Sequence, residues 1–337
     1  MGVYGHGVES WEGRQTLVTG GGGFIAGHLA VTLNRLGANV RAFCRYNSRG
    51  DRGTLDWFEG AETDGIEVVH GDLRDPDSVA RGLLGVETVF HLGAMVAIPY
   101  SFGNPRSFID TNVGGALNVA QAALTAGVRR VVHVSTSEVY GNARSLPITE
   151  DHPLAPRSPY AASKVAADML MLSWHRAYAL PVVVARPFNT YGPHQSARAV
   201  VPAIIIQALR GRHLRLGRLE PRRDLTFVAD TVAGLLAIGA SNGVEGETLQ
   251  LGSGSDVSIG ELVELIGELT GQRLHPELDP ARVRPDGAEV SRLVSDHGRV
   301  TQLTGWRPEV SLRDGLTRTW RWLERNADRY RAAEYAQ

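Results

Sequence analysis

The 337-residue chain has a single cysteine, Cys44, and a single lysine, Lys164. One cysteine excludes an intrachain disulfide and favours a reducing compartment, so we expect a cytoplasmic protein. No run of residues approaches the roughly 18 apolar residues of a membrane span, and Met1 to Arg14 lacks the apolar segment of a secretion signal. We therefore expect no membrane partner.

Excess charge of either sign is also missing. The 35 Lys and Arg residues balance 36 Asp and Glu residues, which gives a formal net charge of -1. Because binding to nucleic acid normally needs a basic surface, we expect no nucleic-acid partner. What the chain has in quantity is glycine, with 39 residues, and hydrophobic residues, at 43%. At this length, such a composition is typical of a packed, turn-rich enzyme.

Short apolar runs alternate with helical patterns along the first part of the chain. We expect strands at 15–19, 39–44, 66–70, 86–91, 129–135 and 181–186, and helices at 24–36, 75–84, 105–126 and 159–179. Strands that alternate with helices form right-handed βαβ units. The pattern therefore predicts an α/β fold with a Rossmann-like, doubly wound parallel sheet.

After about residue 188 the elements become shorter and richer in Pro and Arg. We expect helices at 201–209, 230–240, 258–269 and 312–333, and strands at 224–228 and 247–251. We predict a first domain over 1–188 and a smaller C-terminal α/β domain over 189–337 that caps it and holds a substrate. In such folds the chain can cross between the two domains more than once.

Four consecutive glycines, Gly20 to Gly23, separate the first expected strand from the first expected helix. Gly20-x-x-Gly23-x-x-Ala26 follows the dinucleotide-binding fingerprint, with alanine in the third position. Residues without side chains let the backbone approach a pyrophosphate, whose charge is stabilised at the helix N-terminus. An ordinary glycine-rich turn is the alternative, but the flanking strand and helix favour a nucleotide cofactor.

The ends of the second and third strands bear on the choice of cofactor. An NAD site usually has an acidic residue after the second strand, where this chain has Cys44-Arg45-Tyr46-Asn47. Arg45 can pair with a 2′-phosphate, which favours NADP over NAD, or be an ordinary surface residue of an Arg-rich chain. Asp72 follows the third strand and either reaches the adenine edge or serves as a turn or N-cap residue.

Tyr160 and Lys164 lie one turn apart on the same face of the helix expected at 159–179. A nearby ammonium stabilises a phenolate, so we expect Lys164 to lower the pKa of Tyr160 and make it a base for a sugar hydroxyl. A surface lysine beside a buried tyrosine is the alternative. The chain uses Arg at all 34 other basic positions, and this exception favours a specific task for a compact ammonium.

The strand expected at 129–135 leads directly into Thr136-Ser137-Glu138. The carboxyl ends of parallel strands are where ligands bind in such sheets. Thr136 can hydrogen-bond a substrate hydroxyl, and Glu138 can act as a base. A capping or solvent-facing role is the alternative for Glu138.

Over nearly its whole length, the chain resembles the extended short-chain dehydrogenase/reductases of the nucleotide-sugar epimerase and dehydratase type. The stretches that carry the resemblance are Thr19 to Leu29, Gly71-Asp72-Leu73, His91-Leu92-Gly93-Ala94, Ser135 to Gly141, Tyr160 with Lys164, 186–193, 223–228 and Arg284-Pro285. Within this group, the runs at 46–48, 98–101 and 195–200 resemble UDP-N-acetylglucosamine 4,6-dehydratases of the legionaminic-acid type.

The resemblance implies a tightly bound NADP or NAD that is regenerated in each turnover, no metal, and a nucleotide-diphosphate sugar as substrate. The implied cofactor-binding residues are Gly20, Gly23, Phe24, Ile25, Arg45, Asp72, Leu73, Leu92, Ala94, Tyr160 and Lys164. The implied catalytic residues are Thr136, Ser137, Glu138, Tyr160 and Lys164, and the implied substrate-binding residues are Asn189, Arg223 and Arg284.

The resemblance also implies a homodimer through a four-helix contact of the helices at 105–126 and 159–179. The residues on which we base this expectation are Ala116, Ala120, Ala123, Ala166, Met169 and Leu170.

The implied reaction is a 4,6-dehydration, with a UDP-hexosamine as the expected substrate. Carbon 4 is oxidised, water is lost across carbons 5 and 6, and the hydride returns to carbon 6. Many such dehydratases have Asp at the position of Ser137 as the acid for the leaving 6-hydroxyl, whereas GDP-mannose dehydratases resemble this chain in having Ser. The alternatives are an NDP-sugar 4-epimerase, a UDP-glucuronate decarboxylase and a non-catalytic nucleotide sensor.

Overall fold

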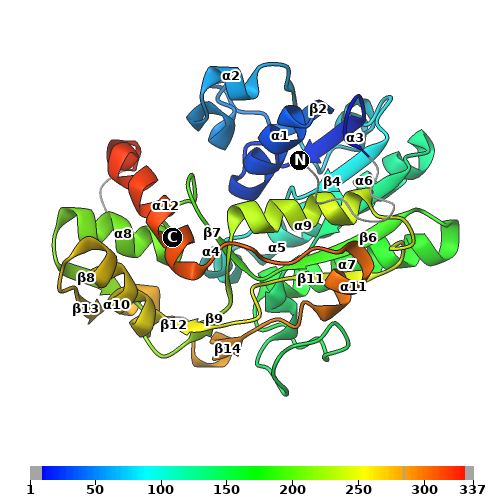
Figure 1. Ribbon diagram of the computed structural model, residues 1–337. Helices are drawn as coiled ribbons and strands as arrows, with labels where there is room; N and C mark the ends of the chain where they lie inside the picture. Colours follow the sequence, from blue (N-terminus) through cyan, green and yellow to red (C-terminus); the bar gives the residue numbers. More distant parts are fainter. Residues whose placement is uncertain (1–9, 284, 331–337) are drawn as a thin grey trace.

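A seven-stranded parallel sheet forms the centre of the molecule (Figure 1). The computed structural model describes residues 10–283 and 285–330. The strand order is β11-β6-β5-β4-β1-β2-β3, and every neighbouring pair is parallel. The strands are β1 (Gln15–Thr19), β2 (Asn39–Arg45), β3 (Glu67–Gly71), β4 (Thr88–His91), β5 (Arg130–Val134), β6 (Val182–Pro187) and β11 (Thr248–Leu251). The prediction of a Rossmann-like, doubly wound sheet is confirmed.

Successive residues of each strand face opposite sides of the sheet, and each side has its own hydrophobic core. On one side, Val18 and Phe90 pack with α1 (Phe24–Arg35) and α9 (Val228–Ala240). On the other side, Leu17 and Val89 pack with α3 (Pro76–Gly82), α6 (Gly115–Ala126) and α7 (Pro159–Tyr178). Because both faces are covered, the strands consist of almost continuous apolar runs.

The helix expected at 105–126 consists of three segments. These are α5 (Pro105–Phe108), the π-helical segment η2 (Ile109–Gly114) and α6, and α4 (Ile98–Gly103) comes before them. Other short elements between strands of the large sheet are η1 (Gly53–Trp57), α2 (Gly60–Thr63) and η3 (Ser137–Tyr140).

Three of the four alanines on which we based the expected dimer contact point inward, whereas Ala166 on α7 is exposed. Ala116, Ala120 and Ala123 are fully buried in the core between α6 and the sheet. The outer faces of α6 and α7 instead expose Leu117, Leu124 and Met169. The three alanines therefore cover the sheet, and the dimer expectation now depends on the exposed apolar residues.

A smaller region lies at one side of the sheet and is built from short strands and helices (Figure 1). β7 pairs with β10, β8 with β13 and β9 with β14 in parallel, and β9 pairs with β12 in antiparallel. Its strands are β7 (Asn189–Tyr191), β8 (His213–Leu216), β9 (Arg222–Arg223), β10 (Leu225–Phe227), β12 (Val257–Ser258), β13 (His275–Leu278) and β14 (Arg292–Leu293). The helices after β7, apart from α9, are α8 (Val200–Arg210), α10 (Ile259–Thr270), η4 (Pro280–Arg282), η5 (Asp286–Ala288), α11 (Gly298–Thr304), α12 (Leu312–Asn326) and η6 (Ala327–Arg329).

The sequence-based boundary at residue 188 cuts through the large sheet. Although β11 comes late in the chain, it pairs with β6, and Phe188 N donates to Leu251 O at 2.8 Å. The chain thus leaves the sheet after β6, returns for α9 and β11, and leaves again. The helix and the strand were expected from the sequence, but their place beside the sheet was not, because a strand's pairing partner is not visible in its own sequence.

None of the helices in the part of the chain that the structure describes combines the length and the apolar character of a membrane span.

Candidate active site

The strand order reverses between β1 and β4, and ligands of open α/β sheets bind at the carboxyl ends of the strands at such a point. Gly20 follows β1 with φ +72°, and a Cβ at this position would lie 2.7 Å from Gly93 Cα, beyond the end of β4. Both the backbone angle and the close approach require glycine. The glycine turn is therefore fixed at the switch point of the sheet.

The N-terminus of α1 fits a diphosphate. Gly23 is the N-cap residue without a side-chain hydrogen bond, and the first turn of α1 has no acidic residue. A Cβ at Gly21 would lie 2.7 Å from Ala42 Cβ, and a Cβ at Gly22 would lie 2.9 Å from Arg52 O. The unpaired N–H groups at a helix start favour an anion, and this turn leaves them without a competing carboxylate.

Arg45 and Asp72 lie at the carboxyl ends of neighbouring strands, because Arg45 pairs in register with Gly71. Arg45 is exposed. Asp72 forms an ion pair with Arg74, with 2.5 Å between Asp72 Oδ2 and Arg74 Nη2, and this hydrogen bond lowers the pKa of Asp72 to about 2. Since Asp72 Oδ1 also accepts the Arg74 backbone N–H, the residue has the geometry of a turn aspartate. Its contact with an adenine stays a prediction.

The remaining expected cofactor residues surround the glycine turn. Phe24 and Ile25, in the first turn of α1, are partly buried against the core. Leu73 is buried, and its Cδ1 would lie 2.6 Å from a Cβ at Gly93. Leu92 and Ala94 flank Gly93 and are both half-buried. Leu73 thus has a packing role in addition to any contact with a cofactor.

Tyr160, Thr136 and Glu138 meet at the carboxyl end of β5. Ser158 caps α7 by accepting the Ala161 N–H at 3.1 Å, which places Tyr160 in the first turn of the helix. Thr136 is the N-cap of η3, and its Oγ1 accepts the Glu138 N–H at 3.3 Å. The Thr136 side chain is hydrogen-bonded to Tyr160, and the Glu138 carboxylate is close enough to raise the pKa of that phenol. Ser137, between Thr136 and Glu138 in the sequence, is also buried.

The expectation that Lys164 lowers the pKa of Tyr160 is wrong for this structure. Burial raises the pKa of Tyr160 to about 12, the hydrogen bond to Thr136 opposes the rise, and the charges of Glu138 and Asp168 add to it. Lys164 Nζ donates to Val134 O at 2.7 Å. The ammonium therefore binds the end of β5, and the charges that act on the phenol are those of two carboxylates.

Lys164 is buried, so the alternative of a surface lysine is excluded. Burial lowers the pKa of Lys164 to about 8, while the Asp168 charge raises it. An ammonium with such a pKa changes its charge within the range in which enzymes work.

Two of the three expected substrate residues lie at the start of the smaller region, and Arg284 lies outside the described residues. The Oδ1 atom of Asn189, on β7, is buried without a hydrogen-bond partner among the described residues. Arg223, on β9, is buried and lies 3.4 Å from Glu289, measured from Nη2 to Oε1. A buried amide oxygen without a partner is costly, and ligand binding can relieve that cost.

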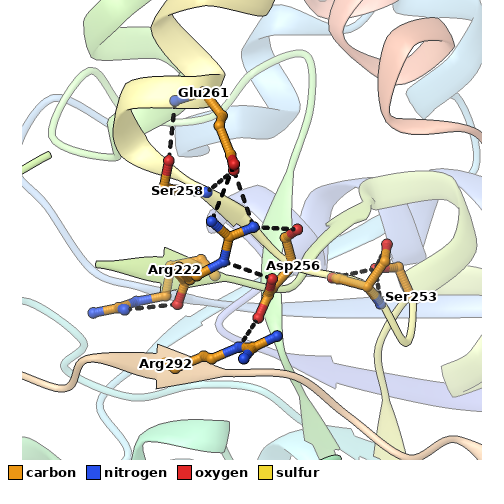
Figure 2. Close-up of polar contacts among 8 residues, drawn as sticks. Arg222, Ser253, Asp256, Ser258, Glu261 and Arg292 are labelled. Carbon is orange, nitrogen blue, oxygen red and sulfur yellow. Dashed lines mark hydrogen bonds and ion pairs between the residues drawn. The ribbon is translucent and has the colours of Figure 1, made fainter. Parts of the chain in front are cut away.

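The neighbouring residue, Arg222, anchors β9 on the other side of the strand (Figure 2). Its Nε donates to Asp256 Oδ1 at 2.8 Å, and its Nη2 lies 3.0 Å from Glu261 Oε2. Asp256 also pairs with Arg292 of β14. Because successive strand residues face opposite sides, these ion pairs fix the side of β9 on which Arg223 lies.

A cavity of about 670 Å³ lies beside β9. Its lining includes Leu219, Glu220, Pro221 and the same Glu289 that pairs with Arg223. This volume is in the usual range for a small-molecule site. The cavity and Arg223 are thus parts of one region.

A buried polar cluster lies behind Tyr160 and Lys164 and was not predicted from the sequence. His91 and His133 are register partners on β4 and β5, and their ring centroids lie 5.4 Å apart. Asp168 of α7 and Arg186 of β6 complete the cluster, and all four side chains are buried. The sequence signal that could have revealed this cluster is the presence of polar residues, such as His91, His133 and Arg186, in strands that are covered on both faces.

The fold and the site define a nucleotide-binding α/β protein with a buried Tyr–Lys pair. Residues 17–319 match the family model described as GDP-mannose 4,6 dehydratase. A UDP-glucose 4-epimerase of Mycolicibacterium smegmatis is 35% identical over 90% of this chain and 97% of its own length. A dTDP-glucose 4,6-dehydratase of an Actinoplanes species is 32% identical over 92% of this chain and 98% of its own length.

Solved structures agree with these matches. The dTDP-glucose 4,6-dehydratase DesIV from Streptomyces venezuelae, with NAD and TYD bound, has a TM-score of 0.85 and 34% identity over 95% of this chain and 100% of its own. The epimerase Mth375 from Methanothermobacter thermautotrophicus has a TM-score of 0.85 and 32% identity over 96% of each chain. The chain belongs to the GDP-mannose 4,6-dehydratase family, and it is an enzyme of the nucleotide-sugar dehydratase and epimerase kind.

Proposed function

We propose that the protein is a nucleotide-sugar 4,6-dehydratase with internal redox chemistry. The observation that carries the proposal is the position of Glu138, whose carboxylate lies beside Tyr160 at the end of β5. A 4,6-dehydratase removes two protons from its substrate, one from the 4-hydroxyl and one from carbon 5. An epimerase removes only the first, so of these two reactions only the dehydratase has a task for a second base at this place.

The residues of the glycine turn fit a dinucleotide cofactor, which the proposal requires. The α1 N-terminus would hold the diphosphate, and Phe24, Ile25, Leu73, Leu92 and Ala94 surround that position. When bound, the cofactor would supply a hydride acceptor for carbon 4 and a hydride donor for carbon 6. NADP is our preferred form because Arg45 stands where NAD sites carry an acid, although DesIV is described with NAD.

The cofactor preference can be measured by titrating both dinucleotides against the wild type and Arg45→Ala. A loss of affinity confined to NADP supports the 2′-phosphate contact. Equal losses for the two dinucleotides would exclude it.

The proposed reaction begins with Tyr160, which takes the proton of the 4-hydroxyl while carbon 4 is oxidised. Because burial raises the pKa of this phenol, only its minor phenolate form acts as the base, and that form is a strong base for an alcohol. The ketone acidifies the proton on carbon 5, which Glu138 removes, and the 6-hydroxyl leaves as water with a proton from Glu138 or Ser137. Carbon 6 then receives the hydride and carbon 5 a proton, so the 4-keto-6-deoxy product is the substrate less one water.

We propose a UDP-hexosamine as substrate, on the strength of the runs at 46–48, 98–101 and 195–200. Asn189, Arg223 and Arg284 would hold the diphosphate, since the planar guanidinium suits phosphate oxygens. The Asn189 Oδ1 atom, which has no hydrogen-bond partner among the described residues, supports this assignment. The smaller region would then be the substrate domain.

We further propose a cytoplasmic homodimer. Leu117 and Leu124 on α6 and Met169 on α7 are exposed apolar residues on helices that flank each other, which suits a four-helix contact. The single cysteine supports the compartment.

A 4-epimerase is the second candidate, and Ser137 is the observation that favours it. This buried side chain carries no carboxyl group to protonate the leaving 6-hydroxyl. The experiment is to incubate the protein with UDP-, GDP- and dTDP-sugars, UDP-hexosamines among them, and to follow the mass of the sugar. Loss of one water supports the dehydratase. An unchanged mass with inversion at carbon 4 would replace it by the epimerase.

A further inference from the structure

Asp168 lies on α7 four residues after Lys164, and both side chains are buried. Residues four apart share one face of a helix, and here that face meets the end of β5. Lys164 Nζ donates to Val134 O at 2.7 Å, and Ser135 Oγ donates to Asp168 Oδ2 at 2.8 Å. The two side chains therefore contact the last residue of β5 and the residue that follows it.

Arg186 of β6 is a second cation near the Asp168 carboxylate, in addition to Lys164. Its Nη2 and Nε donate to Asp168 Oδ2 at 3.0 and 3.2 Å, and its Nη1 donates to Tyr140 Oη at 3.0 Å. One buried carboxylate thus faces two cations. Charges without water around them are costly unless they are paired, so this carboxylate is the main stabilising partner of both.

The two histidines of the cluster add no charge. His133 Nε2 lies 3.3 Å from Asp168 Oδ1, and His91 Nδ1 lies 2.8 Å from Thr19 Oγ1. Burial lowers the pKa of each imidazole. Both rings are therefore neutral at physiological pH.

The other ionisable groups that face α7 are few. Burial raises the pKa of Tyr140 and of Tyr160, so both phenols are neutral, and Glu138 on η3 acts on Tyr160. On the outer side, Arg106 of α5 and Asp110 of η2 pair with each other, with 2.7 Å between Nε and Oδ1. Within the buried cluster, the negative charge near Lys164 is therefore that of Asp168.

We propose that Asp168 is a positioning residue, whose carboxylate keeps Lys164 in the charged form and directed at the end of β5 although Arg186 is close. An arginine does not lose its proton in a protein. When the carboxylate is removed, the repulsion of two buried cations is therefore relieved by deprotonation of Lys164. The importance of that charge for turnover rests on the proposed function, but the charge itself can be measured without turnover.

The single lysine makes the test direct. Protein that is labelled with ¹³C at lysine Cε gives one side-chain signal, that of Lys164, and its shift against pH gives the midpoint of the Lys164 titration. In the wild type we expect a midpoint near 8. In Asp168→Asn it should fall by at least about one pH unit, and Asp168→Glu, which keeps the charge, should restore most of the difference. An unchanged midpoint in Asp168→Asn would overturn the proposal.

Arg186→Gln provides an independent arm if circular dichroism shows that Asp168→Asn does not fold. Without the Arg186 guanidinium, the Asp168 carboxylate stabilises only the Lys164 ammonium, and the midpoint of the Lys164 titration should rise. A fall or no change would contradict the proposal. A role of Asp168 in packing alone does not predict shifts of opposite sign in the two variants.

Turnover distinguishes this inference from the proposed function. If Lys164 must be charged, the alkaline limit of the pH–rate profile should move to lower pH in Asp168→Asn together with the midpoint. A moved midpoint with an unmoved rate profile would leave the role of Asp168 standing and would refute the catalytic role of Lys164.

Discussion

The contact between Gly20 and Gly93 gives a quantitative prediction about the cofactor turn. In Gly20→Ala, the new Cβ meets Gly93 Cα at 2.7 Å and Gly93 N at 2.9 Å, both of them backbone atoms that move only with the β4 loop. The left-handed backbone at φ +72° costs about 1 kcal/mol with alanine. Overpacking adds about 1–3 kcal/mol. The free energy of unfolding should fall by about 2–4 kcal/mol.

Gly85→Ala is the matched control. Gly85 also has φ +72°, but a Cβ there has no atom within 4 Å. It should cost only the backbone term of about 1 kcal/mol. Urea denaturation gives both values, and calorimetric titration with NAD and NADP should show lost affinity in Gly20→Ala alone. Equal destabilisation of the two variants, or normal cofactor affinity in Gly20→Ala, would refute the argument that close approach fixes this turn.

Three further predictions concern catalysis and pH. Glu138→Gln should still oxidise carbon 4, which is seen as reduced cofactor by absorbance, but the rate of water elimination should fall by about 100-fold or more. Full turnover in this variant would exclude Glu138 as the base. Lys164→Arg keeps the net charge but places a bulkier guanidinium group in a buried position. Oxidation at carbon 4 should therefore slow by about 100-fold or more in single-turnover measurements. Unchanged kinetics would contradict this prediction. Burial lowers the pKa of His28 to about 4 and that of His194 to about 3, whereas the unfolded chain protonates near 6.5, so stability should fall as the pH drops below about 6.5. The slope of the urea midpoint against pH should be shallower in the double variant His28→Gln, His194→Asn, and an identical slope would show that other groups cause it.

Local sequence signals were sufficient to predict the sheet, the glycine turn and the Tyr160–Lys164 pair. A glycine run between a strand and a helix, and a tyrosine and a lysine one turn apart, are patterns within a few residues, and the structure has the Gly20 turn and the buried Lys164 at the carboxyl ends of the strands. The alternation of apolar runs with helices was sufficient for the parallel fold.

What the sequence could not show depends on contacts between distant segments. The pairing of β11 with β6, the inward face of Ala116 and the partners of Asp168 each require knowledge of which element lies beside which. The pKa of Tyr160 was predicted in the wrong direction for the same reason. Spacing placed Lys164 on the correct face but could not show that its ammonium binds Val134 O, or that burial and two carboxylates act on the phenol.

The central claim is that Glu138 removes and returns the proton on carbon 5, and turnover in D₂O tests it most directly. A dehydratase that works in this way yields a product that has lost one water, carries one solvent deuterium at carbon 5, and has received at carbon 6 the hydrogen that began on carbon 4. Mass spectrometry and proton NMR of the 4-keto sugar detect both labels. A product without solvent deuterium at carbon 5, or a sugar of unchanged mass inverted at carbon 4, would contradict the account.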